Sequence, residues 1–296
     1  KTYQKKGSNP VTAIENLNLS VQQGEIFGLL GPNGAGKTTF INILSGSVMK
    51  TSGFVEVWGF NLDKNPRQVR ASIGIVAQDV NLDPFFTPES LLDLQAGLYG
   101  IKKKDRITSK ILNLVSLEKQ AKSYARSLSG GMKRRLMVAK SLVHQPPIII
   151  LDEPTAGVDV ELRQNLWKNV KTLNQEGVTI ILTTHYLEEA EKMCDRIGIL
   201  NKGNLVALDT TQKLLEKIQI KKISIKVNNR VNINENKFKT LKIVSSTNDE
   251  INLSYDKNEL KIDQIIKLIE ENGARILDLS TDDGDLEDVF LSLTKS

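Results

Sequence analysis

Cysteine is almost absent from this chain of 296 residues. Cys194 is the single example, so no disulfide can form within the chain, and the composition fits a reducing compartment. Long hydrophobic runs are missing as well, because runs such as IIIL at Ile148–Leu151 are far shorter than the about 20 residues that a membrane-spanning helix needs. These absences exclude a disulfide-stabilised fold and favour a globular protein with a hydrophobic core.

Aromatic residues are scarce, at 5% of the chain, and no stripe of basic residues interleaves with them. Proteins that bind single-stranded nucleic acid use such stripes, because bases stack on aromatic rings while cations follow the phosphates. The formal net charge is +5, but the excess is spread along the chain. The sequence therefore predicts no nucleic-acid partner.

The hydrophobic pattern alternates between strand-like and helix-like segments. Four segments predict strands, namely EIFGLL (Glu25–Leu30), IGIVAQ (Ile73–Gln78), IIIL (Ile148–Leu151) and VTIILT (Val178–Thr183). The last two are continuous β-branched runs, which are typical of strands buried on both faces. The alternating LNLSV, Leu17 to Val21, predicts a half-buried strand. Between the last two buried strands, the spacing of Leu162, Leu166, Val170 and Leu173 predicts a helix. This order predicts an α/β fold, with a mostly parallel sheet covered by helices on both faces.

Two other regions have different patterns. The stretch from Pro88 to Lys140 lacks strand signals and predicts a helical insert. Near Ile218 the composition shifts towards Asn, Lys and Ile, and a β-α-β-β-α-β order follows, with its first helix near Phe238. We expect a nucleotide-binding domain over residues 1–217, with a helical subdomain at about 86–144, and a small ferredoxin-like α+β domain over residues 218–296.

The segment GPNGAGKTT matches the phosphate-binding loop (P-loop) pattern G-x-x-x-x-G-K-[ST]. It follows a predicted strand and precedes a helical pattern, which is the context that the pattern requires. The predicted phosphate cradle comprises Gly31, Pro32, Asn33, Gly34, Ala35, Gly36, Lys37, Thr38 and Thr39. Its glycines let the backbone curl around phosphate oxygens, Lys37 reaches the β- and γ-phosphates, and the Thr38 hydroxyl ligates Mg²⁺.

An acidic pair follows the strand IIIL, with Asp152 and Glu153 as consecutive residues. Asp152 fits the carboxylate that accompanies a P-loop on the side of the metal ion. Glu153 could hold or deprotonate the attacking water. An acidic pair in a turn before Pro154 would have no such meaning alone, but it has one after a P-loop and a buried strand.

Two more polar residues end predicted strands. Gln78 ends IGIVAQ, where it could contact the γ-phosphate or its metal ion, and His185 follows VTIILTT, where it could donate to the γ-phosphate. In open α/β sheets, ligands bind beyond the carboxyl ends of the strands. We therefore expect both residues beside the P-loop, although His185 could also be an ordinary surface histidine.

These motifs resemble those of the ATP-binding-cassette (ABC) ATPases, the motor subunits of ABC transporters. The resemblance covers Lys1 to about Leu215 and rests on GPNGAGKTT, Gln78, LSGGM, ILDEP, AGVD and His185, in this order. Met132 stands where the commonest signature of the family has Gln. With that residue, LSGGMKRRL and the tail LEDVFLSLT resemble the exporter-type branch (ABC-2, multidrug- or sodium-export-like). The resemblance implies a RecA-like P-loop NTPase fold with an antiparallel β edge.

The resemblance also implies roles that the residue patterns do not supply. Ser129, Gly130 and Gly131 correspond to the signature loop, which grips the γ-phosphate of an ATP held by a second subunit. Asp159 corresponds to the loop that joins the two sites, and Tyr3 to an aromatic residue that stacks on adenine, although Tyr3 could instead be an edge-strand residue. The family pattern thus implies a homodimer that holds two ATP molecules, each with Mg²⁺, head to tail.

By the same resemblance, the chain would be a cytoplasmic ATPase, peripheral at the membrane, that drives export through a permease on a separate chain. One alternative is a soluble ABC ATPase acting on nucleic acid or ribosomes, which the single P-loop and the missing basic stripes disfavour. A regulatory module without turnover is disfavoured by Glu153, and a small-molecule kinase would not explain LSGG.

The loop after Gln78 is the expected contact with that permease. It holds Phe85 and Phe86 beside Pro84, and it leads into the insert that carries Ser129. The resemblance places the permease's coupling helix in this region. The alternative is that both phenylalanines belong to the hydrophobic core.

Overall fold

The computed structural model describes residues 1–4, 7, 9–156, 160–229, 231, 240–282 and 284–294. The chain divides into two compact units, Lys1–Asp209 and Thr210–Ser296. Within the described residues, no helix combines the length and the hydrophobicity that crossing a membrane requires.

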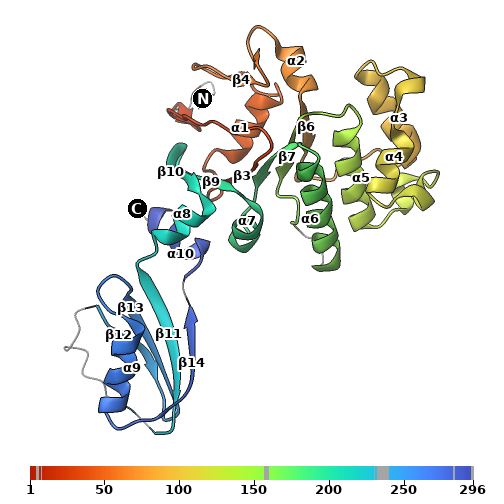
Figure 1. Ribbon diagram of the computed structural model, residues 1–296. Helices are drawn as coiled ribbons and strands as arrows, with labels where there is room; N and C mark the ends of the chain where they lie inside the picture. The colour runs from red at the N-terminus through yellow and green to blue at the C-terminus, as the bar shows by residue number, and fades with distance from the viewer. Residues whose placement is uncertain are drawn as a thin grey trace. The chain divides into compact units, whose positions relative to one another are not determined.

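A six-stranded sheet forms the centre of the first unit (Figure 1). Its order is β10 (Asn204–Thr210), β9 (Arg196–Asn201), β3 (Ile26–Leu30), β8 (Thr179–Thr183), β7 (Ile148–Asp152) and β6 (Ile73–Val76). Neighbours from β9 to β6 are parallel. Their carboxyl ends therefore lie along one edge, and the predicted mostly parallel sheet is confirmed.

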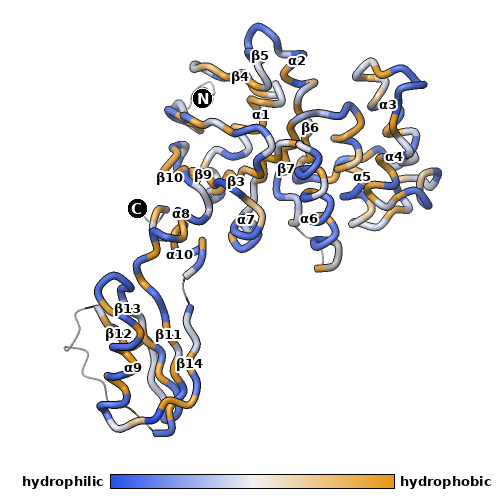
Figure 2. The backbone as a smooth tube through the Cα atoms, viewed as in Figure 1, coloured by the Kyte–Doolittle hydropathy of each residue, from blue (hydrophilic) through white to orange (hydrophobic). Residues whose placement is uncertain are grey.

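Helices cover both faces of this sheet, because its central strands are hydrophobic on both sides (Figure 2). Helices α1 (Lys37–Leu44) and α2 (Pro66–Ala71) lie on one face, and α6 (Val160–Gln175) and α7 (Leu187–Met193) on the other (Figure 1). The side chains of Phe27, Ile150 and Leu182 are fully buried between the layers. Two short antiparallel pairs complete the unit, β1 (Thr2–Tyr3) with β2 (Val11–Thr12), and β4 (Glu56–Val57) with β5 (Phe60–Asn61).

The strand predicted at Leu17–Val21 was wrong, because this segment is irregular in the structure. Leu17, Leu19 and Val21 do pack against the core, so the alternation of their side chains is real. A period of two reports which side of an extended chain is buried, and it does not by itself supply a neighbouring strand to pair with.

The insert between β6 and β7 is helical, as predicted. It contains α3 (Pro88–Leu98), α4 (Thr108–Leu114) and α5 (Gly130–Leu142), with short 3₁₀ turns at Lys103–Asp105, Glu118–Gln120 and Ala125–Ser127. Helix α5 begins at Ser129, whose hydroxyl caps the helix by accepting a hydrogen bond from the Met132 N–H.

The second unit contains an antiparallel sheet. Its elements are α8 (Thr211–Glu216), β11 (Ile220–Val227), β12 (Lys242–Ser246), β13 (Glu250–Asp256), α9 (Ile262–Glu271), β14 (Ile276–Asp282) and α10 (Leu286–Thr294). The sheet order β12-β13-β11-β14 is that of a ferredoxin-like fold. The apolar face of α9 packs in one core with Ile223 and Ile225. The first helix predicted for this unit, near Phe238, lies outside the described residues.

Candidate nucleotide-binding site

The P-loop connects β3 to α1, at the carboxyl edge of the sheet. Gly34 and Gly36 have φ angles of 82° and 112°, which side chains strongly disfavour. A Cβ atom at Gly31 would lie 2.5 Å from the Leu200 carbonyl oxygen, so this position also excludes a side chain. The exposed residues of the loop are Pro32, Asn33, Gly34 and Thr38. Glycine is therefore required at Gly34 by its backbone conformation, at Gly31 by close approach to another segment, and at Gly36 by both.

A hairpin turn between β9 and β10, which was not predicted from the sequence, supports the P-loop. Lys202 and Gly203 form this two-residue turn with φ angles of 48° and 84°, as in type I′ hairpins. The Gly203 N–H donates to the Ala35 carbonyl oxygen at 3.0 Å. In the sequence, this turn is indicated by the Asn-Lys-Gly-Asn segment at residues 201–204, which is typical of a tight turn.

Lys37 curls back over the loop from the first turn of α1. Its Nζ donates to the Gly31 carbonyl oxygen at 2.6 Å and to that of Pro32 at 3.3 Å. Burial lowers the pKa of Lys37, while the negative charges of Glu153 and Asp152 act in the opposite direction. The ammonium group is thus held at the loop by neutral carbonyls, with two carboxylates near enough to favour its charge.

Asp152 ends β7 beside the last residue of β8. The Thr183 hydroxyl is fully buried and donates to Asp152 Oδ1 at 2.5 Å. This hydrogen bond fixes the orientation of the carboxylate at the edge of the sheet.

Glu153 adopts a left-handed backbone conformation, with φ at 48°. The Glu153 N–H donates to the Thr183 carbonyl oxygen at 3.0 Å, and Glu153 is only 7% exposed. His185 Nδ1 lies 2.6 Å from Glu153 Oε2, and the His185 N–H is 3.3 Å from the same oxygen. The strained turn therefore places a buried carboxylate directly against the imidazole, as strained residues at functional sites often do.

Gln78 is two residues beyond the end of β6, and its side chain is exposed. The backbone carbonyl oxygen of Gln78 accepts a 2.7 Å hydrogen bond from the guanidinium group of Arg134. The same guanidinium group also donates to the backbone carbonyl oxygens of Asp152 and Glu153. Arg134 was not predicted from the sequence, where it lies in the basic run after LSGGM. The structure therefore joins Gln78 to the acidic pair through α5.

Tyr3 lies near the far end of the P-loop. Its hydroxyl is 3.5 Å from the Thr39 hydroxyl, and its ring is 38% exposed. The ε-ammonium group of Lys1 lies over the ring, 4.8 Å from its centroid. The structure therefore places a partly exposed aromatic residue beside the loop, with Lys1 over one face of its ring.

Comparison with known proteins agrees with this geometry. The family model described as ABC transporter matches residues 14–156. The linearmycin resistance ATP-binding protein LnrL of Bacillus subtilis (strain 168) is 33% identical over 303 residues, covering 98% of this chain and 96% of that protein. The Nod factor export ATP-binding protein I of Neorhizobium galegae is 41% identical over 210 residues, covering 70% of this chain and 60% of that protein.

The chain belongs to the ABC transporter ATPase family.

Solved structures of ABC cassettes confirm the P-loop NTPase fold. A dimeric structure of the ATP-binding cassette MJ0796 in a post-hydrolysis state, bound to ADP and Pi, matches with a TM-score of 0.63 and 28% identity. The match covers 71% of this chain and 95% of that one. Together with the relatives, it confirms the resemblance to exporter-type ABC ATPases, and with it the class of enzyme, an ATP hydrolase.

The signature of this ABC ATPase, Ser129 to Gly131, begins α5. Ser129 and Gly130 are exposed, and among the hydrogen bonds of the described residues none joins the signature to the P-loop. The first N–H groups of a helix lack partners within it, so this end of α5 is open to an acceptor. Asp159, predicted to join the two sites of a dimer, lies outside the described residues.

The donor set of the ABC site fits Mg²⁺. Thr38, Gln78 and Asp152 offer hydroxyl, amide and carboxylate oxygens, the hard ligands that Mg²⁺ prefers. The described residues hold no group of three or more His, Cys, Asp or Glu that could bind a metal ion alone.

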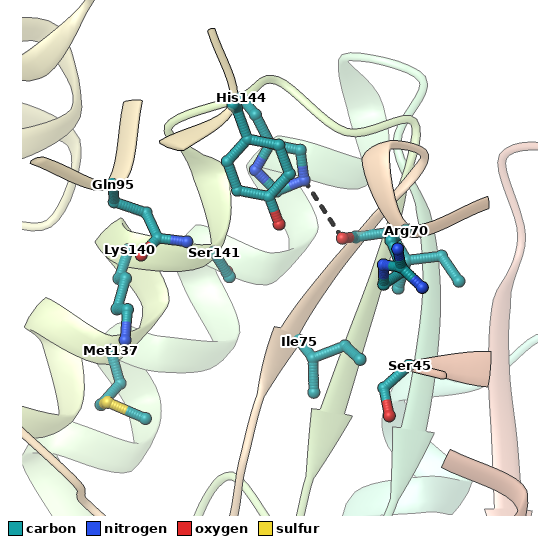
Figure 3. Close-up of a pocket in the computed structure, with 10 residues that line it drawn as sticks. Ser45, Arg70, Ile75, Gln95, Met137, Lys140, Ser141 and His144 are labelled. Carbon is teal, nitrogen blue, oxygen red and sulfur yellow. Dashed lines mark hydrogen bonds between the residues drawn. The ribbon is translucent and has the colours of Figure 1, made fainter. Parts of the chain in front are cut away.

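A cavity of about 230 Å³ lies elsewhere in the ABC fold, between β6 and the insert (Figure 3). The rings of Tyr99 and His144 stack there, with centroids 3.8 Å apart. His144 Nε2 lies 3.1 Å from the carbonyl oxygen of Ile73, the first residue of β6. The cavity is thus at the amino end of the strand, at the opposite end from Gln78, and it is separate from the nucleotide site.

Proposed function

We propose that this ABC ATPase binds ATP with Mg²⁺ at the carboxyl edge of its sheet and hydrolyses it in a head-to-tail homodimer, driving export through a permease on a separate chain. The observation that carries the proposal is the contact of His185 with buried Glu153, one residue beyond Asp152. Glu153 follows β7 and His185 follows β8, the strand that pairs with the P-loop strand β3. The names of the relatives, a resistance protein and export proteins, support the direction of transport.

The geometry supports a division of roles. Lys37 and the N–H groups of the P-loop would hold the phosphates, Tyr3 would stack on adenine, and Thr38, Asp152 and Gln78 would hold Mg²⁺, which neutralises phosphate charge when bound. Glu153 would accept a proton from the attacking water, because it is the carboxylate not tied to Thr183. His185 would orient Glu153 through Nδ1 and present its other face, which is exposed, to the γ-phosphate.

A dimer is proposed because one chain carries two anion-binding elements that do not meet. The P-loop faces the phosphates, while Ser129 to Gly131 form an open helix start elsewhere in the same chain. Two copies arranged head to tail would bring the signature of each copy to the P-loop of the other. ATP would then hold the copies together, and loss of the γ-phosphate would release them.

The permease would dock on the loop after Gln78. Phe85 is 69% exposed, which disfavours the alternative that it belongs to the core. The Ala125 N–H donates to the Phe86 carbonyl oxygen at 2.8 Å, and the Arg126 N–H donates to that of Pro84 at 3.2 Å. Arg126 also lies over the Phe85 ring. The docking loop is therefore tied by its backbone to the segment that leads into Ser129.

The domain limits expected from the sequence belong to the same proposal. Residues 1–217 would be the nucleotide-binding domain, with a helical subdomain at about 86–144 that carries the signature. Residues 218–296 would be an accessory domain without catalytic residues, used for dimer contact or regulation. The assembly would lie at the cytoplasmic face of the membrane, held there by the permease.

The test is Glu153→Gln, which removes the proton acceptor and keeps the shape. ATP affinity should be retained, turnover should fall by about 100-fold or more, and ATP-bound dimers should accumulate on gel filtration. Turnover near that of the wild type would show that Glu153 is not the catalytic carboxylate.

A further inference from the structure

Arg134, in the second turn of α5, contacts five backbone carbonyl oxygens. Arg134 is only 6% exposed. One terminal nitrogen donates to Ala77 at 2.8 Å and Gln78 at 2.7 Å, and the other to Glu153 at 2.8 Å and Asp152 at 3.3 Å. The Nε atom donates to Pro154 at 3.1 Å. All three nitrogens of the guanidinium group are therefore used.

The acceptors belong to two segments that are distant in sequence. Ala77 and Gln78 follow β6, whereas Asp152 to Pro154 end β7 and follow it. Burial lowers the pKa of Arg134, and the charges of Asp152 and Asp79 oppose that effect. A planar guanidinium group with five N–H donors can serve both segments at once, which the three donors of a lysine ammonium cannot do with the same geometry.

We propose that Arg134 is a positioning residue that holds Gln78 and Glu153 in register with each other and with the start of α5. The inference rests on the proposed function, since it gives these two residues their roles. Arg134 lies five positions after Ser129 on one rigid helix. A displacement of the signature would therefore move the ends of β6 and β7 together, and catalysis would be sensitive to how the signature is engaged.

The neighbouring Arg135 provides a matched control. Its guanidinium group also donates to two carbonyl oxygens, those of Val115 at 2.8 Å and Ser116 at 2.9 Å. Both acceptors follow α4, so this contact stays within the helical insert. Arg134→Lys and Arg135→Lys thus both disturb hydrogen bonds from one helix to backbone carbonyl oxygens, five for Arg134 and two for Arg135. Only the first variant affects the segments that carry Gln78 and Glu153.

The first experiment compares these two variants with the wild type. Arg134→Lys should lower kcat by about 10- to 100-fold, the scale of a misplacement of about 1 Å at a reacting group, with ATP affinity within about twofold because the P-loop is untouched. Amide hydrogen exchange should accelerate in peptides covering residues 77–80 and 152–156. Arg135→Lys should leave kcat within about twofold and accelerate exchange only near residues 113–117.

The second experiment is a double-mutant cycle with Gln78→Ala, which removes the side chain and keeps the carbonyl acceptor. If Arg134 acts by positioning Gln78, the loss of kcat from Gln78→Ala should be smaller in Arg134→Lys than in the wild type, and unchanged in Arg135→Lys. Arg134→Gln, which keeps donors without a buried charge, replaces Arg134→Lys if the latter does not fold.

The outcomes separate this inference from the proposed function. A folded Arg134 variant with wild-type kcat, or effects that add fully with those of Gln78→Ala, would overturn the positioning role while leaving the ATPase intact. A wild-type protein without ATP turnover would refute the proposed function itself, and with it the roles that Arg134 is said to position.

Discussion

Thr183→Val is the most direct test of how the structure orients Asp152. The substitution keeps the branched shape of a fully buried side chain and removes its hydroxyl. That hydroxyl donates to Asp152 Oδ1 at 2.5 Å and lies 3.3 Å from the Glu153 N–H, which keeps its bond to the Thr183 carbonyl oxygen. The main loss is therefore one hydrogen bond to a carboxylate, worth about 1.5–3 kcal/mol.

The substitution should also lower activity. Partners that orient a metal ligand cost about 10- to 100-fold in metal affinity or activity when they are removed. We expect kcat to fall within this range, and the Mg²⁺ concentration for half-maximal activity to rise. The assay is steady-state ATP hydrolysis over a Mg²⁺ titration, with thermal unfolding measured in parallel.

Thr179→Val, at the opposite end of β8, is the control. Its hydroxyl is also buried, and it accepts a 2.9 Å hydrogen bond from the Gly24 N–H, away from the site. It should cost about 0.5–1.5 kcal/mol of stability, the usual value of a neutral hydrogen bond, without changing the Mg²⁺ dependence. Equal kcat and equal Mg²⁺ dependence in the two variants would refute the claim that Thr183 orients Asp152 for the metal.

Three other outcomes follow from the same geometry. Lys37→Ala should weaken ATP binding and abolish turnover. Gly130→Asp should spare ATP binding by the monomer, because a Cβ atom at Gly130 would have no neighbour within 4 Å, but it should block dimerisation. Mixing the two variants should restore some activity, and a strong loss of ATP binding by the Gly130 variant would contradict a site in trans. Replacing Phe85 and Phe86 with Ser should preserve ATPase activity but reduce co-purification with the permease. Unfolding of this variant would show that the two phenylalanines belong to the hydrophobic core, and normal permease binding would place the docking surface elsewhere. Burial lowers the pKa of His144, so the folded state should lose stability as pH falls below about 6.5, where the unfolded chain takes up the proton first. His144→Phe should flatten that part of the plot of unfolding free energy against pH, and an unchanged plot would contradict the lowered pKa of His144.

The strands beside the site were predictable because they are continuous apolar runs with polar residues where they end. The runs ending at Leu30 and Leu151 identified β3 and β7, and the residues after them are Gly31 and Asp152. Strands β9 and β10 were missed, and the segment at Leu17–Val21 was wrongly predicted as a strand. Strand β9 joins the sheet by pairing with β3, which lies far along the chain, and local periodicity does not report such a neighbour.

The sequence by itself determined the chemistry of the site. Glycines at fixed spacing, a lysine, a hydroxyl and carboxylates after apolar strands suffice, because parallel strands bring their carboxyl ends to one edge whatever the details of packing. Only the tertiary structure decided how that chemistry is held. The left-handed turn at Glu153, the bond from Thr183 to Asp152 and the five acceptors of Arg134 depend on buried polar groups finding partners across distant segments, and Arg134 is 57 positions from Ala77. Such pairings are enforced by burial, which arises only when the whole sheet and its insert have packed.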